Sequence, residues 1–145
     1  MSRTRAVSTT LGYVLTLAIA AILVTGLITA GGAYVENERE QVIRDELTVI
    51  GQQIAADVER TDRLVRASEG STTVRLNQSF SDRVTGTAYR ISLDDTDDEV
   101  VVSSVDPNVT VSVRVQTETP MRESTAGGGP IQLVYQSGEL EVQNV

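Results

Sequence analysis

Thirty consecutive residues near the start of the chain, Ala6–Val35, carry no charged side chain. Arg3 and Arg5 precede this stretch, and three glutamates follow within five residues of its end. As an α-helix it would extend roughly 45 Å, which exceeds the ~30 Å hydrocarbon core of a bilayer. The sequence therefore predicts a basic leader at residues 1–6 and a transmembrane helix at residues 7–35.

The charges on the two sides of this helix predict its orientation in the membrane. Arginines precede it and carboxylates follow it, so the positive-inside rule places the N-terminus in the cytoplasm. Residues 36–145 are then extracytoplasmic. We expect a single-pass protein of the cell membrane, with the possibility of a surface filament left open.

Three interpretations of the apolar stretch compete. A cleaved secretory signal has an apolar region of only about 7–15 residues, shorter than the stretch found here. A plain single-pass anchor needs no processing. In the third interpretation, the short basic leader is removed on the cytoplasmic side and the apolar helix stays in the mature protein. Gly26 and Ala30 have the small-xxx-small spacing that lets helices approach closely, although transmembrane helices are in general rich in small residues.

Residues 36–69 are predicted to form an amphipathic helix that continues the first one, since no proline separates them. Its apolar residues recur three, four or seven positions apart, which is the spacing of one helix face. They are Ile43, Leu47, Ile50, Ile54, Val58 and Val65. Gly51 within this helix is either a close packing contact or a weak point, and the sequence does not distinguish the two.

From residue 70 onward the apolar residues alternate with polar ones, which is typical of half-buried strands. The predicted strands cover residues 73–76, 89–93, 99–105, 109–115, 131–135 and 140–142. Asp106-Pro107-Asn108 and Ser137-Gly138 are predicted hairpin turns, and residues 125–130 a loop. The predicted fold is α+β: one long helix whose 43–65 face packs on a small antiparallel β head, residues 70–145.

Composition argues against catalysis. The chain has no Cys, His, Lys or Trp, which removes the usual zinc sites, the Ser-His-Asp and Cys-His systems and lysine chemistry. No pair of acids lies in surroundings that would raise a pKa. A net charge of −8 with 3% aromatic residues is unlike a nucleic-acid-binding surface. We expect no enzyme activity, no cofactor, no metal site and no nucleic-acid partner.

Two short motifs and one acidic run remain. Asn77-Gln78-Ser79 and Asn108-Val109-Thr110 match the N-glycosylation pattern, and Asn108, in a turn, is the better acceptor. Asp94–Glu99 contains five acids in six positions but lacks the spacing of a calcium-binding loop. We interpret this run as a solvated turn.

The leader and the start of the apolar stretch resemble a known family. The segment Arg5-Ala6-Val7-Ser8-Thr9-Thr10-Leu11-Gly12 is similar to the start of haloarchaeal type IV pilins. Arginine in place of lysine, together with excess acid, likewise resembles the composition of proteins from salt-loving archaea. The resemblance implies that a prepilin peptidase cuts between Ala6 and Val7, with Arg5 in the leader.

The resemblance also implies a function. A pilin-like subunit is held in the membrane by its N-terminal helix and assembles through it with other pilin-like subunits, in a surface filament or a secretion pseudopilus. Two positions depart from the family patterns: Leu11 stands where bacterial pilins have glutamate, and Ser8-Thr9 where Ser-Pro is common. The alternative is an uncleaved, membrane-anchored extracytoplasmic binding or accessory module.

Overall fold

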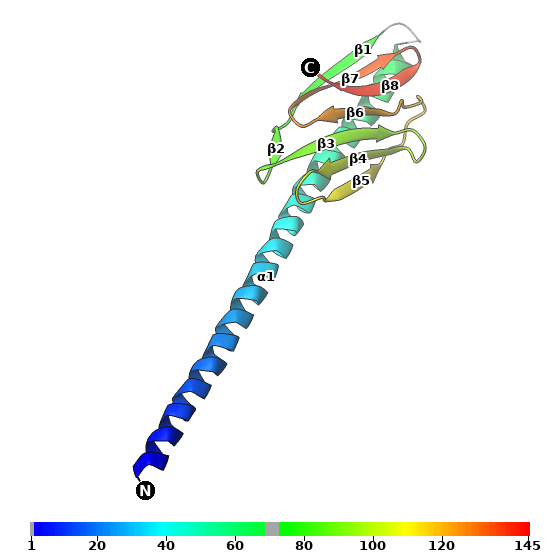
Figure 1. Cartoon of the computed structure of the whole chain (residues 1–145). Helices are drawn as coiled ribbons and strands as arrows, with labels where there is room; N and C mark the ends of the chain where they lie inside the picture. Colours follow the sequence, from blue (N-terminus) through cyan, green and yellow to red (C-terminus); the bar gives the residue numbers. More distant parts are fainter. Residues whose placement is uncertain (1, 69–72) are drawn as a thin grey trace. The chain divides into compact units, whose positions relative to one another are not determined.

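The computed structural model describes the backbone of residues 2–68 and 73–145, and the side chains from residue 7 onward within those ranges. One helix is followed by strands (Figure 1). The elements are α1 (Ser2–Ala67), β1 (Val74–Ser79), β2 (Arg83–Val84), β3 (Thr87–Asp94), β4 (Glu99–Ser104), β5 (Thr110–Arg114), β6 (Ser124–Gly127), β7 (Pro130–Gln136) and β8 (Glu139–Asn144). The α+β class predicted from the sequence is confirmed.

The helix α1 contains both predicted helical segments, so the transmembrane and amphipathic patterns belong to one secondary-structure element. The chain nevertheless divides into two compact units, the first ending at Glu38 and the second comprising Arg39–Val145. At the C-terminal end of α1, the N–H of Ser68 donates to the carbonyl groups of Leu64 and Val65. The predicted helix end at residue 69 lies outside the described residues.

The strands of the second unit form two antiparallel sheets. In the first the order is β1-β7-β8, and in the second it is β2-β3-β4-β5, with β6 also paired to β3. The hairpins β4–β5 and β7–β8 are those predicted from the sequence. Their turns contain Asp106-Pro107, whose peptide bond is cis, and Ser137-Gly138, where both residues have positive φ.

The structure corrects two predictions about the strands. Residues 125–130 were expected to be a loop, but Ser124–Gly127 pairs with β3 and Pro130 begins β7. The pair Arg83–Val84 was not predicted; it forms the short strand β2, which returns into β3 through Thr85 and Gly86, both at positive φ. The described residues therefore contain more strands than the six expected.

Side chains join the two sheets along β6 and β8. The Asn144 side chain accepts a hydrogen bond from the N–H of Gly127 (2.9 Å) and donates to its carbonyl (3.2 Å). The hydroxyl of Ser124 accepts from the N–H of Val142 at 3.0 Å. These hydrogen bonds give partners to backbone groups of β6 and β8.

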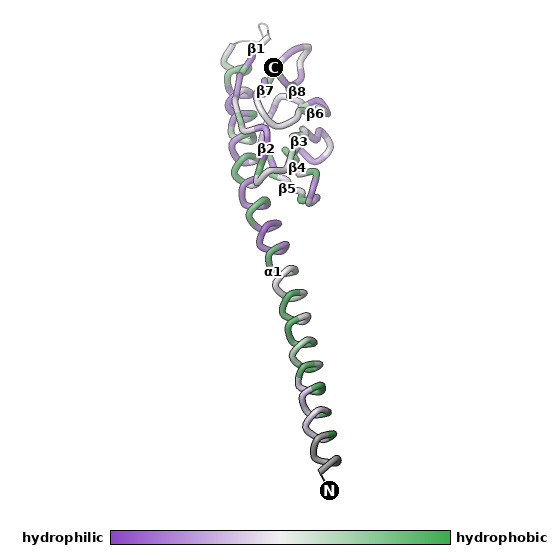
Figure 2. Tube along the Cα trace, turned by 60° about the vertical axis from the view of Figure 1, so that its left-hand side comes forward, coloured by the Kyte–Doolittle hydropathy of each residue, from purple (hydrophilic) through white to green (hydrophobic). Residues whose placement is uncertain are grey.

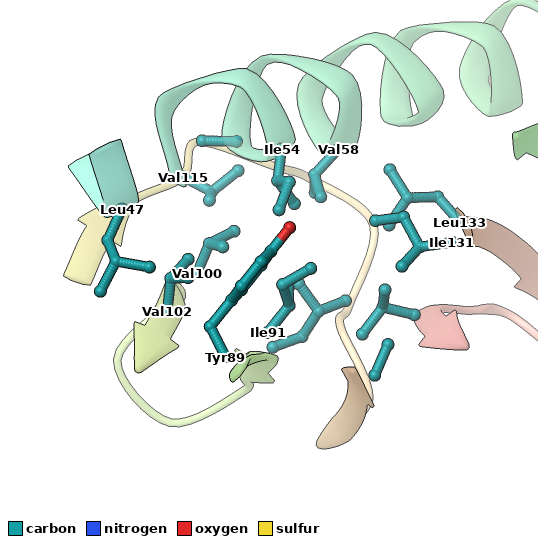
Figure 3. Close-up of a cluster of buried hydrophobic side chains, with 14 of the residues drawn as sticks. Leu47, Ile54, Val58, Tyr89, Ile91, Val100, Val102, Val115, Ile131 and Leu133 are labelled. Atoms are coloured by element: carbon teal, nitrogen blue, oxygen red, sulfur yellow. The ribbon is translucent and has the colours of Figure 1, made fainter. Parts of the chain in front are cut away.

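The apolar face of residues 43–65 packs on the sheets, as predicted. Ile43, Leu47, Ile54 and Val58 are fully buried in one cluster with side chains of β3, β4, β7 and β8. Figure 3 shows Ile54 and Val58 of α1 beside Tyr89, Ile91, Val100 and Val102 of the strands. Gly51 is a close packing contact, because a Cβ atom there would lie 3.1 Å from the side chain of Val113.

Tyr89 contacts both the segment between β1 and β2 and the connection between β6 and β7. Its hydroxyl donates to the carbonyl of Ser81 at 2.8 Å, and Gly128 lies so close that a Cβ atom there would be 2.6 Å from the ring. Burial and the nearby Asp82 carboxylate raise the pKa of Tyr89. Only glycine at position 128 leaves room for this ring, which explains the glycine in the short connection between β6 and β7.

Candidate functional site

The most distinctive surface of the chain is the apolar part of α1. Every residue from Val7 to Arg39 is exposed, including Leu11, Ile22 and Leu27, whose exposed fractions exceed two thirds. Figure 2 shows hydrophobic residues along this part of the helix. A helix that is apolar on all sides is stable only when it is surrounded by lipid or by other protein. By its length and composition α1 can cross a membrane.

Threonine hydroxyls in this segment are satisfied within the helix. Thr16 donates to the carbonyl of Gly12 at 2.8 Å, Thr25 to that of Ala21 at 2.9 Å, and Thr29 to that of Thr25 at 3.0 Å. A hydroxyl in hydrocarbon without a partner would cost several kcal/mol, roughly 2–7 depending on the reference state. The segment can therefore enter an apolar environment with these three hydroxyls already paired.

Small residues make one part of this surface accessible to another helix. Around Gly26, no atom outside the local helix backbone lies within 4 Å of the position that a Cβ would take. Ala30 is one turn further along the same helix face, as the sequence spacing predicted. A second helix can approach the backbone closely there, because neither position carries a long side chain.

The second half of α1 has its polar groups engaged by its own unit. The Asp62 carboxylate, almost fully buried, accepts a hydrogen bond from the N–H of Thr119 (3.0 Å) and forms an ion pair with Arg66 (3.0 Å). Glu59, one turn earlier, accepts from the N–H of Gln116 at 3.3 Å. Together the two carboxylates hold the segment between β5 and β6 against the helix.

The pKa of Asp62 reflects this arrangement. Burial acts to raise it, but the hydrogen bonds from Thr119 and the positive charge of Arg66 outweigh burial and hold the pKa below its usual value. Arg66 also contacts Glu118 at 2.9 Å, on the exposed side of the same cluster. The contacts of Asp62 and Glu59 with Thr119 and Gln116 could not be predicted, since acids on a helix give no sign of which backbone amides they will meet.

The surface of the second unit has several shallow hollows. A groove of about 630 Å³ is bordered by Val49, Ile50 and Phe80, together with Asp45, Glu46, Arg83 and neighbouring residues. Among the described residues, no group of three or more acidic side chains is placed to hold a metal ion. In the acidic run, the Asp94 carboxylate accepts from the N–H groups of Thr96 and Asp97, which closes the turn before β4.

The two sequons lie in different surroundings. Asn77 is in β1, where its side-chain amide oxygen accepts a hydrogen bond from the Gln132 side chain at 2.6 Å. Asn108 is exposed in the turn between β4 and β5. At the predicted leader cleavage site, Arg5 and Ala6 are part of α1 by their backbone, and their side chains lie outside the described set. Val7 is exposed.

The fold and this surface define an α+β protein with one apolar helix long enough to cross a membrane. The chain belongs to the DUF7266 family, described as a family of unknown function, whose profile matches residues 2–144. No curated protein and no solved structure matches the chain.

Proposed function

We propose that this protein is a pilin-like structural subunit. Its N-terminal helix anchors it in the membrane with residues 36–145 outside the cell, and then packs among the helices of other subunits in a filament or pseudopilus. The observation that carries the proposal is that the helix from Val7 to Val35 is apolar and exposed on every side, so it requires surroundings that its own chain does not provide.

The same helix supports both environments that the proposal demands. Its threonine hydroxyls at positions 16, 25 and 29 are paired with its own backbone, which suits lipid. Gly26 and Ala30 leave room for a neighbouring backbone, which suits a helical bundle. No charged residue within residues 7–35 opposes movement from one apolar environment to the other.

The second unit supports a role as the surface of such an assembly. The apolar face of residues 43–65 is covered by the strands, so this unit buries its own core. Its acidic excess keeps it soluble and repels anionic partners. The polar unit would therefore face the solvent while the apolar helices associate.

Processing at the leader is the first test. Protein extracted from its native membranes should begin at Val7, and inactivation of the prepilin peptidase should restore residues 1–6, both read by mass spectrometry of the N-terminal peptide. A start near Gly32 would mean that the apolar helix is discarded and would overturn the proposal. An intact leader in cells with active peptidase would favour the alternative, an uncleaved anchored module.

Mechanical shear is the second test. A filament subunit should be released from intact cells by shear and sediment as a large assembly. An uncleaved anchor should stay with the membranes in the same experiment. The variant Gly26→Leu fills the close-approach position while keeping the helix apolar, so it should retain membrane anchoring but lose the sheared assembly.

A further inference from the structure

We propose that Asn108 carries an N-linked glycan and that the hollow beside it holds the sugar nearest the protein. This inference rests on the extracytoplasmic position of residues 36–145 in the proposed function, since glycosylated sequons belong to surface loops of exported proteins. It concerns a modification that neither the helix nor the assembly requires.

The geometry of the Asn108 sequon favours modification. Asn108 and Thr110 are exposed, whereas Val109 between them is buried. The N–H of Val109 donates to the Ser104 hydroxyl at 3.0 Å, and its carbonyl accepts from the N–H of Ser104 at 2.9 Å. The middle residue thus fixes the backbone while the asparagine and the threonine stay accessible. Within the described part of the chain, the Asn108 side chain makes no hydrogen bond.

The Asn77 sequon is constrained in a different way. All three of its residues belong to β1 and pair with β7, from Asn77 opposite Gln132 to Ser79 opposite Pro130. The Asn77 side chain is the end of a row across three strands, because Gln132 donates to it and Gln143 in turn donates to Gln132 at 3.0 Å. A glycan on Asn77 would have to disturb this row, so the structure favours Asn108 as the acceptor.

The surroundings of Asn108 match the chemistry of a sugar. A hollow of about 350 Å³ is lined by Arg90, Ser103, Ser104, Val105, Asn108 and Thr110. The Ser104 hydroxyl is buried and already bonded to the turn, but those of Ser103 and Thr110 can exchange hydrogen bonds with sugar hydroxyls. Val105, 58% exposed, offers an apolar surface to the C–H face of a sugar ring. No ion pair involves Arg90 in the ranges described, so its guanidinium is available to an acidic sugar.

The transfer needs a lipid-phosphate-linked oligosaccharide as donor and a membrane-bound oligosaccharyltransferase. The side-chain amide nitrogen of Asn108 forms a bond to the anomeric carbon of the first sugar, and the bond from that carbon to the lipid phosphate breaks. The lipid phosphate leaves with the electron pair, and the amide nitrogen gives up one proton. No oxidation or reduction takes place.

The test of occupancy compares variants at position 110. In protein purified from native membranes, the peptide containing Asn108 should carry the glycan mass, and the peptide containing Asn77 should not. Thr110→Ser keeps the sequon and should keep the modification, whereas Thr110→Ala should abolish it. An unmodified Asn108 peptide in the wild-type protein, or a modified one in Thr110→Ala, would overturn the proposal.

The position of the first sugar is tested by a double-mutant cycle between Asn108→Gln and Arg90→Ala. When Arg90 is present, Asn108→Gln removes the glycan and should lower the Tm. In the Arg90→Ala background the same substitution should lower the Tm by less. Equal shifts in both backgrounds would show that the sugar does not contact Arg90, and that part of the proposal would fail.

Protease treatment of intact cells separates this inference from the proposed function. If residues 36–145 are digested from outside and Asn108 is unmodified, the glycan proposal alone fails. If those residues are protected in intact cells and digested only after lysis, the topology on which the proposed function rests has failed.

Discussion

The two parts of α1 differ in what surrounds their apolar side chains. In residues 43–65 most large apolar residues lie on one face, and the strands of the same chain cover that face. In residues 7–35 the apolar residues lie on all sides, and their side chains are exposed. The secondary structure is the same in both parts. The second part therefore folds with its own unit, whereas the first presents an apolar surface that its own chain leaves uncovered.

Removal of a buried side chain from the second part should have the largest effect. Ile54 is fully buried between α1 and the strands, so Ile54→Ala should lower the free energy of unfolding of this unit by about 2–5 kcal/mol. Denaturant unfolding in detergent solution measures the change. The matched variant Ile22→Ala, at a residue 71% exposed, should change the same quantity by less than about 0.5 kcal/mol. Similar losses for both would remove the distinction between the two parts.

A charge placed in the first part should affect the membrane and not the fold. Ile22→Arg should cost about 2.5–3.5 kcal/mol of membrane insertion, the cost of arginine at the centre of a transmembrane helix. The fraction of protein that stays with membranes after an alkaline wash measures the loss. Val49→Arg is the control, because Val49 is 63% exposed but lies in the second part. Should Val49→Arg reduce membrane retention equally, the first part would not be the membrane segment.

The Asp62 carboxylate gives the second unit a dependence on pH. Its pKa is lowered in the folded state, so the stability contributed by its ionised form is present above the unfolded pKa of about 4 and is lost as the pH falls through the folded value. Asp62→Asn should lower the free energy of unfolding at neutral pH by roughly 1–3 kcal/mol.

The same variant should flatten the decline in stability on acidification. Unfolding curves recorded from neutral pH to pH 3 measure both effects. Glu118→Gln is the control, since the Glu118 side chain is 76% exposed and an exposed ion pair contributes less than about 1 kcal/mol. An unchanged slope in Asp62→Asn would show that the ion pair with Arg66 does not contribute to the acid sensitivity of the fold.

Two of the glycines in α1, Gly26 and Gly51, should respond differently to substitution by alanine. At Gly51 the added methyl group would lie 3.1 Å from Val113, so Gly51→Ala should destabilise the second unit by about 1 kcal/mol, overpacking exceeding the gain in helix propensity. At Gly26 the methyl group meets open space, and Gly26→Ala should leave the unfolding of that unit unchanged. Thermal unfolding distinguishes the two, and stabilisation by Gly51→Ala would contradict the close contact with Val113.

The sequence predicted those parts of the fold that depend on local pattern. The helix face of residues 43–65 and the two hairpins with turns at Asp106-Pro107 and Ser137-Gly138 follow from periodicity and turn residues. The strand β6 was missed because Ser-Thr-Ala-Gly carries no alternation of large apolar residues. Its position depends instead on tertiary contacts, including the hydrogen bonds of Ser124 with Val142 and of Asn144 with Gly127.

The candidate site shows the same division. The apolar helix and both sequons were visible in the sequence, because each is a run or a short motif. The contacts by which the Glu59 and Asp62 carboxylates hold the segment after β5 were not visible in the sequence. The backbone amides that they accept from lie more than fifty positions away. The hydrogen bonds that distinguish Asn77 from Asn108 were not visible either. Strand pairing alone brings Gln132 to Asn77 and Gln143 to Gln132.

The most direct measurement compares the full chain with a chain that begins at Arg39, the start of the second unit. Both are produced in the same cells, separated into membrane and soluble fractions, and examined by sedimentation. The full chain should be found in membranes and in sheared assemblies, whereas residues 39–145 should be soluble, monomeric and cooperatively folded. Membrane binding or assembly by residues 39–145 would contradict the account, because association would then belong to the second unit and not to the helix from Val7 to Val35.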